Sequence, residues 1–106
     1  MRGLFIVAGL MLVTAGVAQA TSGPGCLIVT RVAANDVLNM RSGPGASYRV
    51  VDVLPPGNHV IIHLDGPCVP RTVKPSSRWC KVTHYNGDRT TKGWIKRLYT
   101  RDSDCP

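Results

Sequence analysis

The 106-residue sequence contains no glutamate, and its only acidic side chains are six aspartates. These aspartates are scattered over turns, one expected strand and the C-terminal tail, so no two of them form a pair suited to general acid–base catalysis. No Ser-His-Asp order and no nucleophile elbow is present. Cys80 and His84 would share a strand face, which is the one arrangement that suggests a nucleophile with a base. A disulfide would consume that thiol, so we expect a protein that is not an enzyme.

The cysteines lack the C-x-x-C spacing of zinc ribbons and thioredoxin-like redox sites. An even number of cysteines in a short exported chain instead predicts disulfides. Four cysteines are present: Cys26, Cys68, Cys80 and Cys105. His59 and His63 would share one strand face but stand too far apart to bind one ion without other donors. We therefore expect no metal and no cofactor.

Only one long apolar run occurs, from Leu4 to Val13, and it follows the cation Arg2 after one glycine. It is followed by the small residues of Ala18-Gln19-Ala20, and this order is typical of a secretory signal peptide. The run is shorter than the roughly 20 residues that a transmembrane helix needs. We predict a signal peptide over residues 1–20, cleaved before Thr21, and no membrane span. The remaining 86 residues, 21–106, form one domain in this interpretation, secreted or periplasmic.

Beyond residue 20, twelve Lys and Arg residues stand against the six aspartates, a net charge of +6. A positive field of this kind favours anionic partners. A basic composition is equally compatible with plain solubility, so charge alone does not establish binding. No pattern of a nucleic-acid recognition helix is present, and we expect no nucleic acid as partner. Envelope polymers are the anions that an exported protein meets first.

No segment after the signal peptide has the 3.6-residue period of a helix, whereas short β-branched runs are separated by Gly and Pro. A turn at residues 55–58 predicts one β-hairpin, and Asn86-Gly87 predicts another. The segment 65–77 holds three prolines and is expected to be an exposed loop, and 96–99 a terminal turn. The sequence therefore predicts a small all-β barrel.

Residues 38–60, LNMRSGPGASYRVVDVLPPGNHV, resemble the bacterial SH3-like domain, which is common in exported and envelope proteins. Trp79 to Val82 and the Asn86-Gly87 turn followed by Gly93-Trp94-Ile95 extend the resemblance, which covers residues 29–99. It implies an SH3-like barrel of five to seven short strands, with LNMRSGPG opening a long loop. Met40 stands where the family usually has Val or Leu, and we expect it in the core.

The resemblance also implies a disulfide pattern. Relatives often carry one cysteine near the end of the strand before the 65–78 loop and another just after the Trp that follows this loop, which implies the pair Cys68–Cys80 and, by exclusion, Cys26–Cys105. In the chain-entropy model the smaller loop contributes about 3 kcal/mol to stability and the larger one somewhat over about 4 kcal/mol.

In SH3-type folds the peptide groove lies between the loop after the first strand and the neighbouring hairpin. Trp79 and Trp94 are expected chiefly in the core, because a buried large ring contributes roughly 2–3 kcal/mol, with the groove as the alternative. Tyr48 and Tyr85 lie beside turns and are expected as exposed contacts. Arg41 and Arg49 suit a carboxylate or phosphate, although Arg41 suits equally well a role in holding turn carbonyls. The candidate ligand-binding residues are Arg41, Tyr48, Arg49, Tyr85 and Trp94.

Together these features predict a non-catalytic binding module of the cell envelope that recognises peptidoglycan or another anionic wall component. The alternative is a protein-interaction adaptor. In that case the basic 65–78 loop, with Arg71, Lys74 and Arg78, docks another envelope protein.

Overall fold

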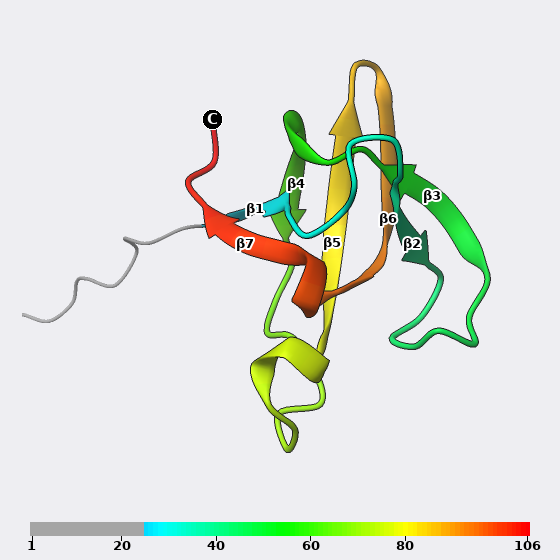
Figure 1. The fold of residues 1–106 in the computed structure, drawn as a ribbon, viewed down its shortest axis with the longest axis vertical. Helices are drawn as coiled ribbons and strands as arrows, with labels where there is room; N and C mark the ends of the chain where they lie inside the picture. Colours follow the sequence, from blue (N-terminus) through cyan, green and yellow to red (C-terminus); the bar gives the residue numbers. More distant parts are fainter. Residues whose placement is uncertain (1–24) are drawn as a thin grey trace, which may run out of the picture.

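The computed structural model describes residues 25–106, apart from the side chains of Asn58 and His59. The predicted signal peptide lies outside these residues. Seven strands and two short 3-10 turns make up the described regular structure (Figure 1). They are β1 Cys26–Val29, β2 Leu38–Arg41, β3 Val50–Leu54, β4 Gly57–Leu64, η2 Pro75–Ser77, β5 Trp79–Asn86, β6 Arg89–Lys96, η3 Arg97–Tyr99 and β7 Thr100–Ser103.

The strands form one curved antiparallel sheet in the order β3-β2-β6-β5-β4-β1-β7. Figure 1 shows the β5–β6 hairpin standing at the centre, with β2 and β3 on one side and β1, β4 and β7 on the other. The 65–78 loop projects from one end. The predicted small all-β barrel is confirmed. No helix within residues 25–106 has the length and apolar character needed to cross a membrane.

Apolar side chains from six of the seven strands meet in one core. Met40, Leu54, Val82 and Ile95 have no exposed surface, and the core position predicted for Met40 is confirmed. The complete buried cluster consists of Leu27, Val29, Leu38, Met40, Leu54, Ile62, Cys80, Val82 and Ile95. Side chains alternate between the two faces of a strand, so each strand places every second residue into this core.

The Asn86-Gly87 signal gives a hairpin, as predicted, and its strands are longer than the sequence indicates. Asn86 pairs with Arg89, so only Gly87 and Asp88 form the turn. Gly87 has φ of 65°. A glycine with positive φ in the first central position is the arrangement of a type II′ turn, whose twist matches that of the strands it joins.

The predicted hairpin across residues 55–58 is wrong. β3 pairs with β2, whereas β4 pairs with β1 and β5. Pro55 and Pro56 both have φ fixed near −65°, which the primed turns of tight hairpins do not tolerate. Gly57, with φ of 91°, then directs the chain toward β1 and away from β3.

The tail contains a strand that the sequence did not indicate. β7 pairs along its whole length with β1, although its residues TRDS show no apolar alternation. Cys105, beyond β7, is bonded to Cys26 at the start of β1, with an S–S distance of 2.00 Å. The second disulfide, Cys68–Cys80, has an S–S distance of 2.01 Å. Both pairs are those that the resemblance implies.

β2 crosses β6 at very short distance, and a glycine makes this possible. Gly93 is buried, and a Cβ built on it would lie 2.6 Å from Met40 Cγ and 2.8 Å from the carbonyl oxygen of Arg41. A real Cβ cannot approach a backbone oxygen so closely. Gly93 therefore allows β2 to dock on the hairpin, with Arg41 opposite Trp94.

We predict that Gly93→Ala destabilises the protein, because the added methyl group forces β2 away from β6 or displaces Met40. Overpacking of this kind costs about 1–3 kcal/mol. Urea denaturation of the two proteins measures the difference in free energy of unfolding. Thr90→Ala, an exposed change on the same strand, is the control. An unchanged free energy of unfolding in Gly93→Ala would show that the β2–β6 crossing has room for the added methyl group.

Candidate functional site

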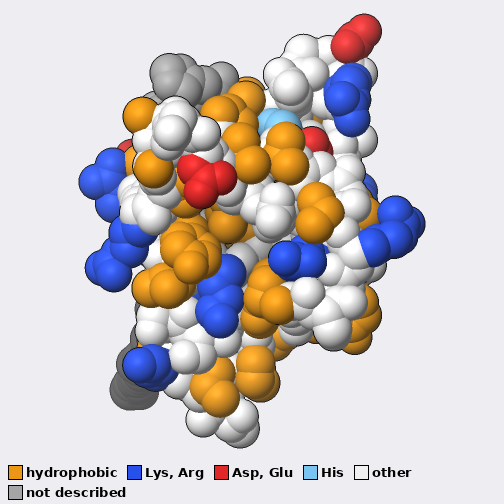
Figure 2. Space-filling view, turned by 45° about the vertical axis from the view of Figure 1, so that its right-hand side comes forward, with side chains coloured by type: hydrophobic (Ala, Val, Ile, Leu, Met, Phe, Trp, Pro, Cys, Tyr) orange, Lys and Arg blue, Asp and Glu red, His pale blue; other side chains and the backbone are white. Residues whose placement is uncertain are grey.

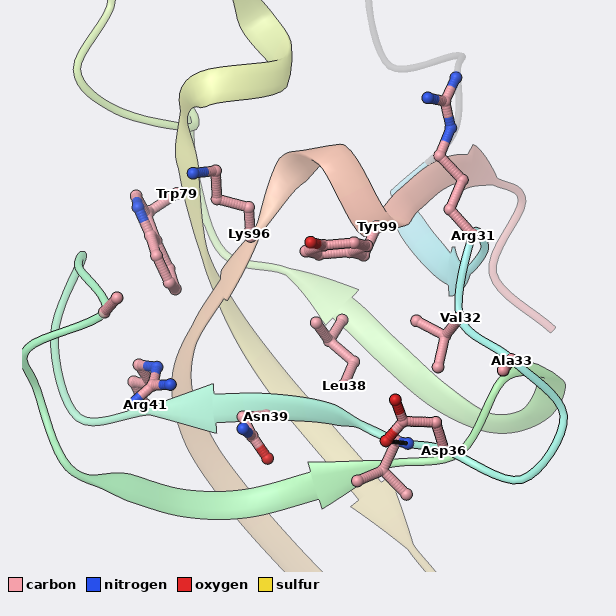
Figure 3. Close-up of a pocket in the computed structure, with 12 residues that line it drawn as sticks. Arg31, Val32, Ala33, Asp36, Leu38, Asn39, Arg41, Trp79, Lys96 and Tyr99 are labelled. Carbon is pink, nitrogen blue, oxygen red and sulfur yellow. Dashed lines mark hydrogen bonds between the residues drawn. The ribbon is translucent and has the colours of Figure 1, made fainter.

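A cleft of about 530 Å³ opens where β2, the start of β5, the end of β6 and η3 meet the 30–37 loop (Figure 3). It is lined by Arg31, Val32, Ala33, Asp36, Val37, Leu38, Asn39, Arg41, Ala46, Trp79, Lys96 and Tyr99. Leu38 lies at its centre in the close-up, and the buried leucine connects the cleft floor to the core. The site is thus assembled from four separate parts of the sequence.

Two aromatic rings stand in the cleft, Trp79 at one end and Tyr99 above Leu38 (Figure 3). Trp79 is fixed by two backbone hydrogen bonds with Val69, with N–O distances of 2.7 and 2.8 Å, and by the disulfide of the adjacent Cys80. Tyr99 ends η3, and its carbonyl oxygen accepts the N–H of Thr30 at 2.8 Å. Both rings are therefore positioned by rigid backbone.

Three cations and one carboxylate line the cleft. Lys96 places its Nζ 5.5 Å from the centroid of the Trp79 ring, a cation–π contact. Arg41 Nη1 donates a 2.9 Å hydrogen bond to the carbonyl oxygen of Tyr48. Arg31 has φ of 60° and points its guanidinium outward at the rim. Asp36 accepts the N–H of Val37 at 2.7 Å. Because three cations stand against this one carboxylate, the cleft lining has an excess of positive charge.

Arg41 is the one candidate residue from the sequence that lines the cleft. Tyr48 is 47% exposed, and its ring lies against Gly43, where an added Cβ would stand 2.4 Å from it. Arg49 is exposed, and its carbonyl oxygen accepts the N–H of Ser42. Neither Tyr48 nor Arg49 is part of the cleft lining.

The other two candidates lie on the outer face of the β5–β6 hairpin. Trp94 is half-buried and stands opposite Arg41 of β2. Tyr85 is 44% exposed and lies toward the hairpin turn, opposite the exposed Ile61 of β4. Trp94 is thus a neighbour of a cleft residue, whereas Tyr85 is at the far end of the hairpin.

The core position expected for the two tryptophans is wrong. Their strand neighbours Cys80 and Ile95 point into the core, so the alternation of the strand turns Trp79 and Trp94 to the outer face. The register of β5 against β6 was the missing information. The sequence also did not single out Tyr99 or Lys96, because their position depends on η3 and on the pairing of β7 with β1.

Residues 36–100 match the family model of the bacterial SH3 domain. The chain belongs to this family. Comparison with curated proteins and with solved structures found no match. Bacterial SH3 domains are binding modules, generally non-catalytic and often related to the cell wall. Leu38, Asn39 and Arg41 of the cleft lining belong to LNMRSGPG, part of the stretch on which the sequence resemblance rests.

A buried hydrogen bond between a histidine and an aspartate lies elsewhere in this SH3 domain. His84 is 2% exposed, and its Nδ1 lies 2.7 Å from Asp52 Oδ2. Its Nε2 is buried without a hydrogen-bond partner among the described residues. Cys80, the thiol that sequence spacing associates with His84, is in a disulfide. The pair therefore joins β3 to β5 within the fold.

No cluster of three or more potential metal-ligating side chains occurs among the described residues. On the hairpin face, Asp65 accepts a 2.6 Å hydrogen bond from Thr83 and lies 3.0 Å from His63 Nδ1. Burial raises the pKa of Asp65, but the hydrogen bonds from Thr83 and His63 and the charge of Lys92 more than offset this, and the pKa is lowered. The carboxylate thus belongs to a polar network.

We predict that Asp52 makes stability depend on pH in acid. Burial raises its pKa, but the hydrogen bonds from His84 and from the Val53 N–H outweigh this, so the folded pKa lies below the ordinary value of 3.8. The stabilisation is complete above that value and is lost as the pH falls through the folded pKa. Urea denaturation should show that the free energy of unfolding decreases as the pH is lowered beyond 3.8.

Asp52→Ala should flatten this acid dependence and cost about 1–3 kcal/mol at neutral pH, because the buried imidazole loses its partner. Asp88→Ala, in the exposed hairpin turn, is the matched control and should follow the wild-type curve. An acid dependence that is identical in wild type and Asp52→Ala would contradict the assignment.

Proposed function

We propose that this bacterial SH3 domain is a non-catalytic module that binds peptidoglycan or another anionic component of the cell wall in the cleft between Trp79 and Tyr99. One observation carries the proposal: two aromatic rings and three cations, opposed by the single carboxylate of Asp36, line one open cleft of about 530 Å³. Ligand sites of this volume usually combine apolar walls with a few placed polar groups.

The chemistry of the cleft suits a ligand with an apolar or ring-shaped body and carboxylate groups. The body would lie against the faces of Trp79 and Tyr99, which bury large apolar area with little loss of side-chain freedom. The carboxylates would accept charge-assisted hydrogen bonds from Arg31, Arg41 or Lys96. Peptidoglycan offers both features, since its glycan strands consist of sugar rings and its stem peptides carry carboxylates.

The surface charge supports an anionic partner. On the face shown in Figure 2, Lys and Arg side chains stand among hydrophobic ones, whereas acidic side chains are few. The predicted export through residues 1–20 would bring the domain to the wall, and its two disulfides suit an oxidising compartment. Secretion and wall binding are parts of this proposal.

We predict that the protein sediments with purified sacculi at low salt and that the bound fraction falls as salt rises, because screening weakens the exposed charges. Trp79→Ala and Tyr99→Ala should weaken binding at every salt concentration, since they remove ring contacts. Arg31→Gln should weaken binding mainly at low salt. Urea denaturation of each variant separates loss of binding from loss of fold.

Arg89→Gln is the matched control, because it removes the same charge at the end of the hairpin, outside the cleft. Equal weakening by Arg31→Gln and Arg89→Gln would mean that bulk charge, not the cleft, attracts the wall. Absence of the wild-type protein from the sacculus pellet at low salt would overturn the proposed function.

A second candidate function, the protein-interaction adaptor, is favoured by a separate pocket of about 410 Å³ at the base of the 65–78 loop. Arg71, Arg78 and Arg97 line it together with Asp102. Arg78 is held in place, since it donates to the carbonyl oxygens of Val73 at 2.9 Å and of Arg71 at 3.2 Å. Such a pocket suits an acidic segment of another envelope protein.

The two candidates make different predictions for Arg71→Gln. If the loop docks a protein, a photoreactive residue at the exposed Thr72 should cross-link one envelope protein in cells, and Arg71→Gln should abolish the adduct without changing sacculus binding. The adduct is read from the mass of the cross-linked band. A cross-link pattern that is the same in Arg71→Gln and wild type would rule out docking through this pocket.

A further inference from the structure

The outer face of the β5–β6 hairpin carries aromatic and cationic side chains in alternation. Trp79 of β5 pairs with Lys96 of β6, and one step further Lys81 pairs with Trp94. Trp94 in turn pairs with Arg41 of β2. Directly paired residues point to the same side of a sheet, so all five side chains share one face. We call Trp79, Lys96, Lys81, Trp94 and Arg41 the aromatic–cation ladder.

The ladder starts inside the cleft and leaves it. Trp79, Lys96 and Arg41 line the cleft, whereas Lys81 and Trp94 lie outside its lining. Diagonal neighbours on an antiparallel pair stand about 7–8 Å apart, which is the expected spacing of Trp79 and Trp94. Adjacent strands are about 4.8 Å apart, so Lys81 and Arg41 flank Trp94 at a total separation of about 10 Å. A second ring platform with a cation on either side thus adjoins the first.

Among the described residues, no cation of the ladder is in a salt bridge, although Asp36 lines the cleft together with Lys96 and Arg41. Their attachments are the ring of Trp79 for Lys96 and the carbonyl oxygen of Tyr48 for Arg41. Further along the hairpin, Lys92 donates to Thr83 at 2.9 Å, and Thr83 donates to Asp65. Asp65, whose backbone N–H is bonded to the carbonyl oxygen of Lys81, therefore has its carboxylate engaged in this network. The ladder keeps a positive charge that an anionic ligand would neutralise.

We propose that the aromatic–cation ladder continues the binding site, and that its ligand is an extended anionic glycan strand without stem peptides, with one disaccharide unit in the cleft at Trp79 and the following disaccharide unit over Trp94. This inference rests on the proposed function, because it takes the wall polymer as the ligand and specifies which part of that polymer the domain reads. Where its stem peptides have been removed, the glycan strand of peptidoglycan has a free carboxylate on each muramic acid unit, which matches cations placed on both sides of a ring platform.

The ring platforms favour a glycan over an acidic peptide. The C–H face of a pyranose ring can cover an indole face while its carboxylate reaches a neighbouring Lys or Arg. An acidic peptide would use Lys81, Lys96 and Arg41 but would leave the face of Trp94 without a partner of matching shape. The half-buried Trp94 is already covered in part, so a flat ring needs to desolvate only the remaining surface.

The test measures the affinity of peptide-free glycan chains, prepared from sacculi as a disaccharide, a tetrasaccharide and an octasaccharide, by tryptophan fluorescence and calorimetry. Affinity should rise from the disaccharide to the tetrasaccharide. Trp94→Ala should lower the affinity for the tetrasaccharide and the octasaccharide roughly three- to tenfold, which is the effect expected from the loss of one stacking contact. The affinity for the disaccharide should not change. Trp94→Phe should restore most of the loss.

Lys81→Gln should reduce the same length-dependent gain, whereas Ile61→Ala, on the same sheet face but outside the ladder, should not. Equal affinity for all chain lengths, or an equal loss for all lengths in Trp94→Ala, would overturn the inference. So would equal affinity for an oligoglutamate of the same charge. Retention on sacculi without binding to any glycan chain would refute the ladder and leave the proposed function standing, whereas absence of sacculus retention would refute both.

Discussion

The close crossing of β2 over β6 is the constraint on which the rest of the molecule depends. With no side chain at Gly93, Met40 enters the core and the backbone of Arg41 approaches β6. This contact attaches the 38–54 arm to the central hairpin. It also determines that Arg41 stands opposite Trp94 and beside the cleft. Core packing and site geometry are thus two results of one backbone approach.

The second structural support of the site is the frame around Trp79. The Cys68–Cys80 disulfide and the paired hydrogen bonds between Val69 and Trp79 hold the start of β5 against the 65–78 loop. In a domain of this size the hydrophobic core alone gives marginal stability, and covalent links compensate for that. The links here also fix the ring that forms one end of the cleft, so stability and ligand geometry share the same residues.

Local features of the chain were predictable from sequence, and those that depend on distant pairing were not. Met40 in the core, the Asn86-Gly87 hairpin and the exposed 65–77 loop follow from residue types within a few positions of one another. The outward direction of Trp79 and Trp94 follows from register, which shifts every side chain to the other face when it changes by one residue. The position of Tyr99 requires β7 on β1, and the polar sequence of β7 gives no sign of it.

The difference between fixed and free cations explains why the cleft, and not the most basic loop, is the better candidate for specificity. Lys96 is held over an indole ring and Arg41 by a turn carbonyl, so binding a ligand costs them little further side-chain entropy. Arg71 is exposed on the loop, and immobilising such a side chain costs about 0.5–1.5 kcal/mol. An exposed loop charge such as that of Arg71 therefore contributes chiefly to long-range attraction, which salt screens, whereas the preorganised cations of the cleft can select a ligand by the spacing of its acid groups.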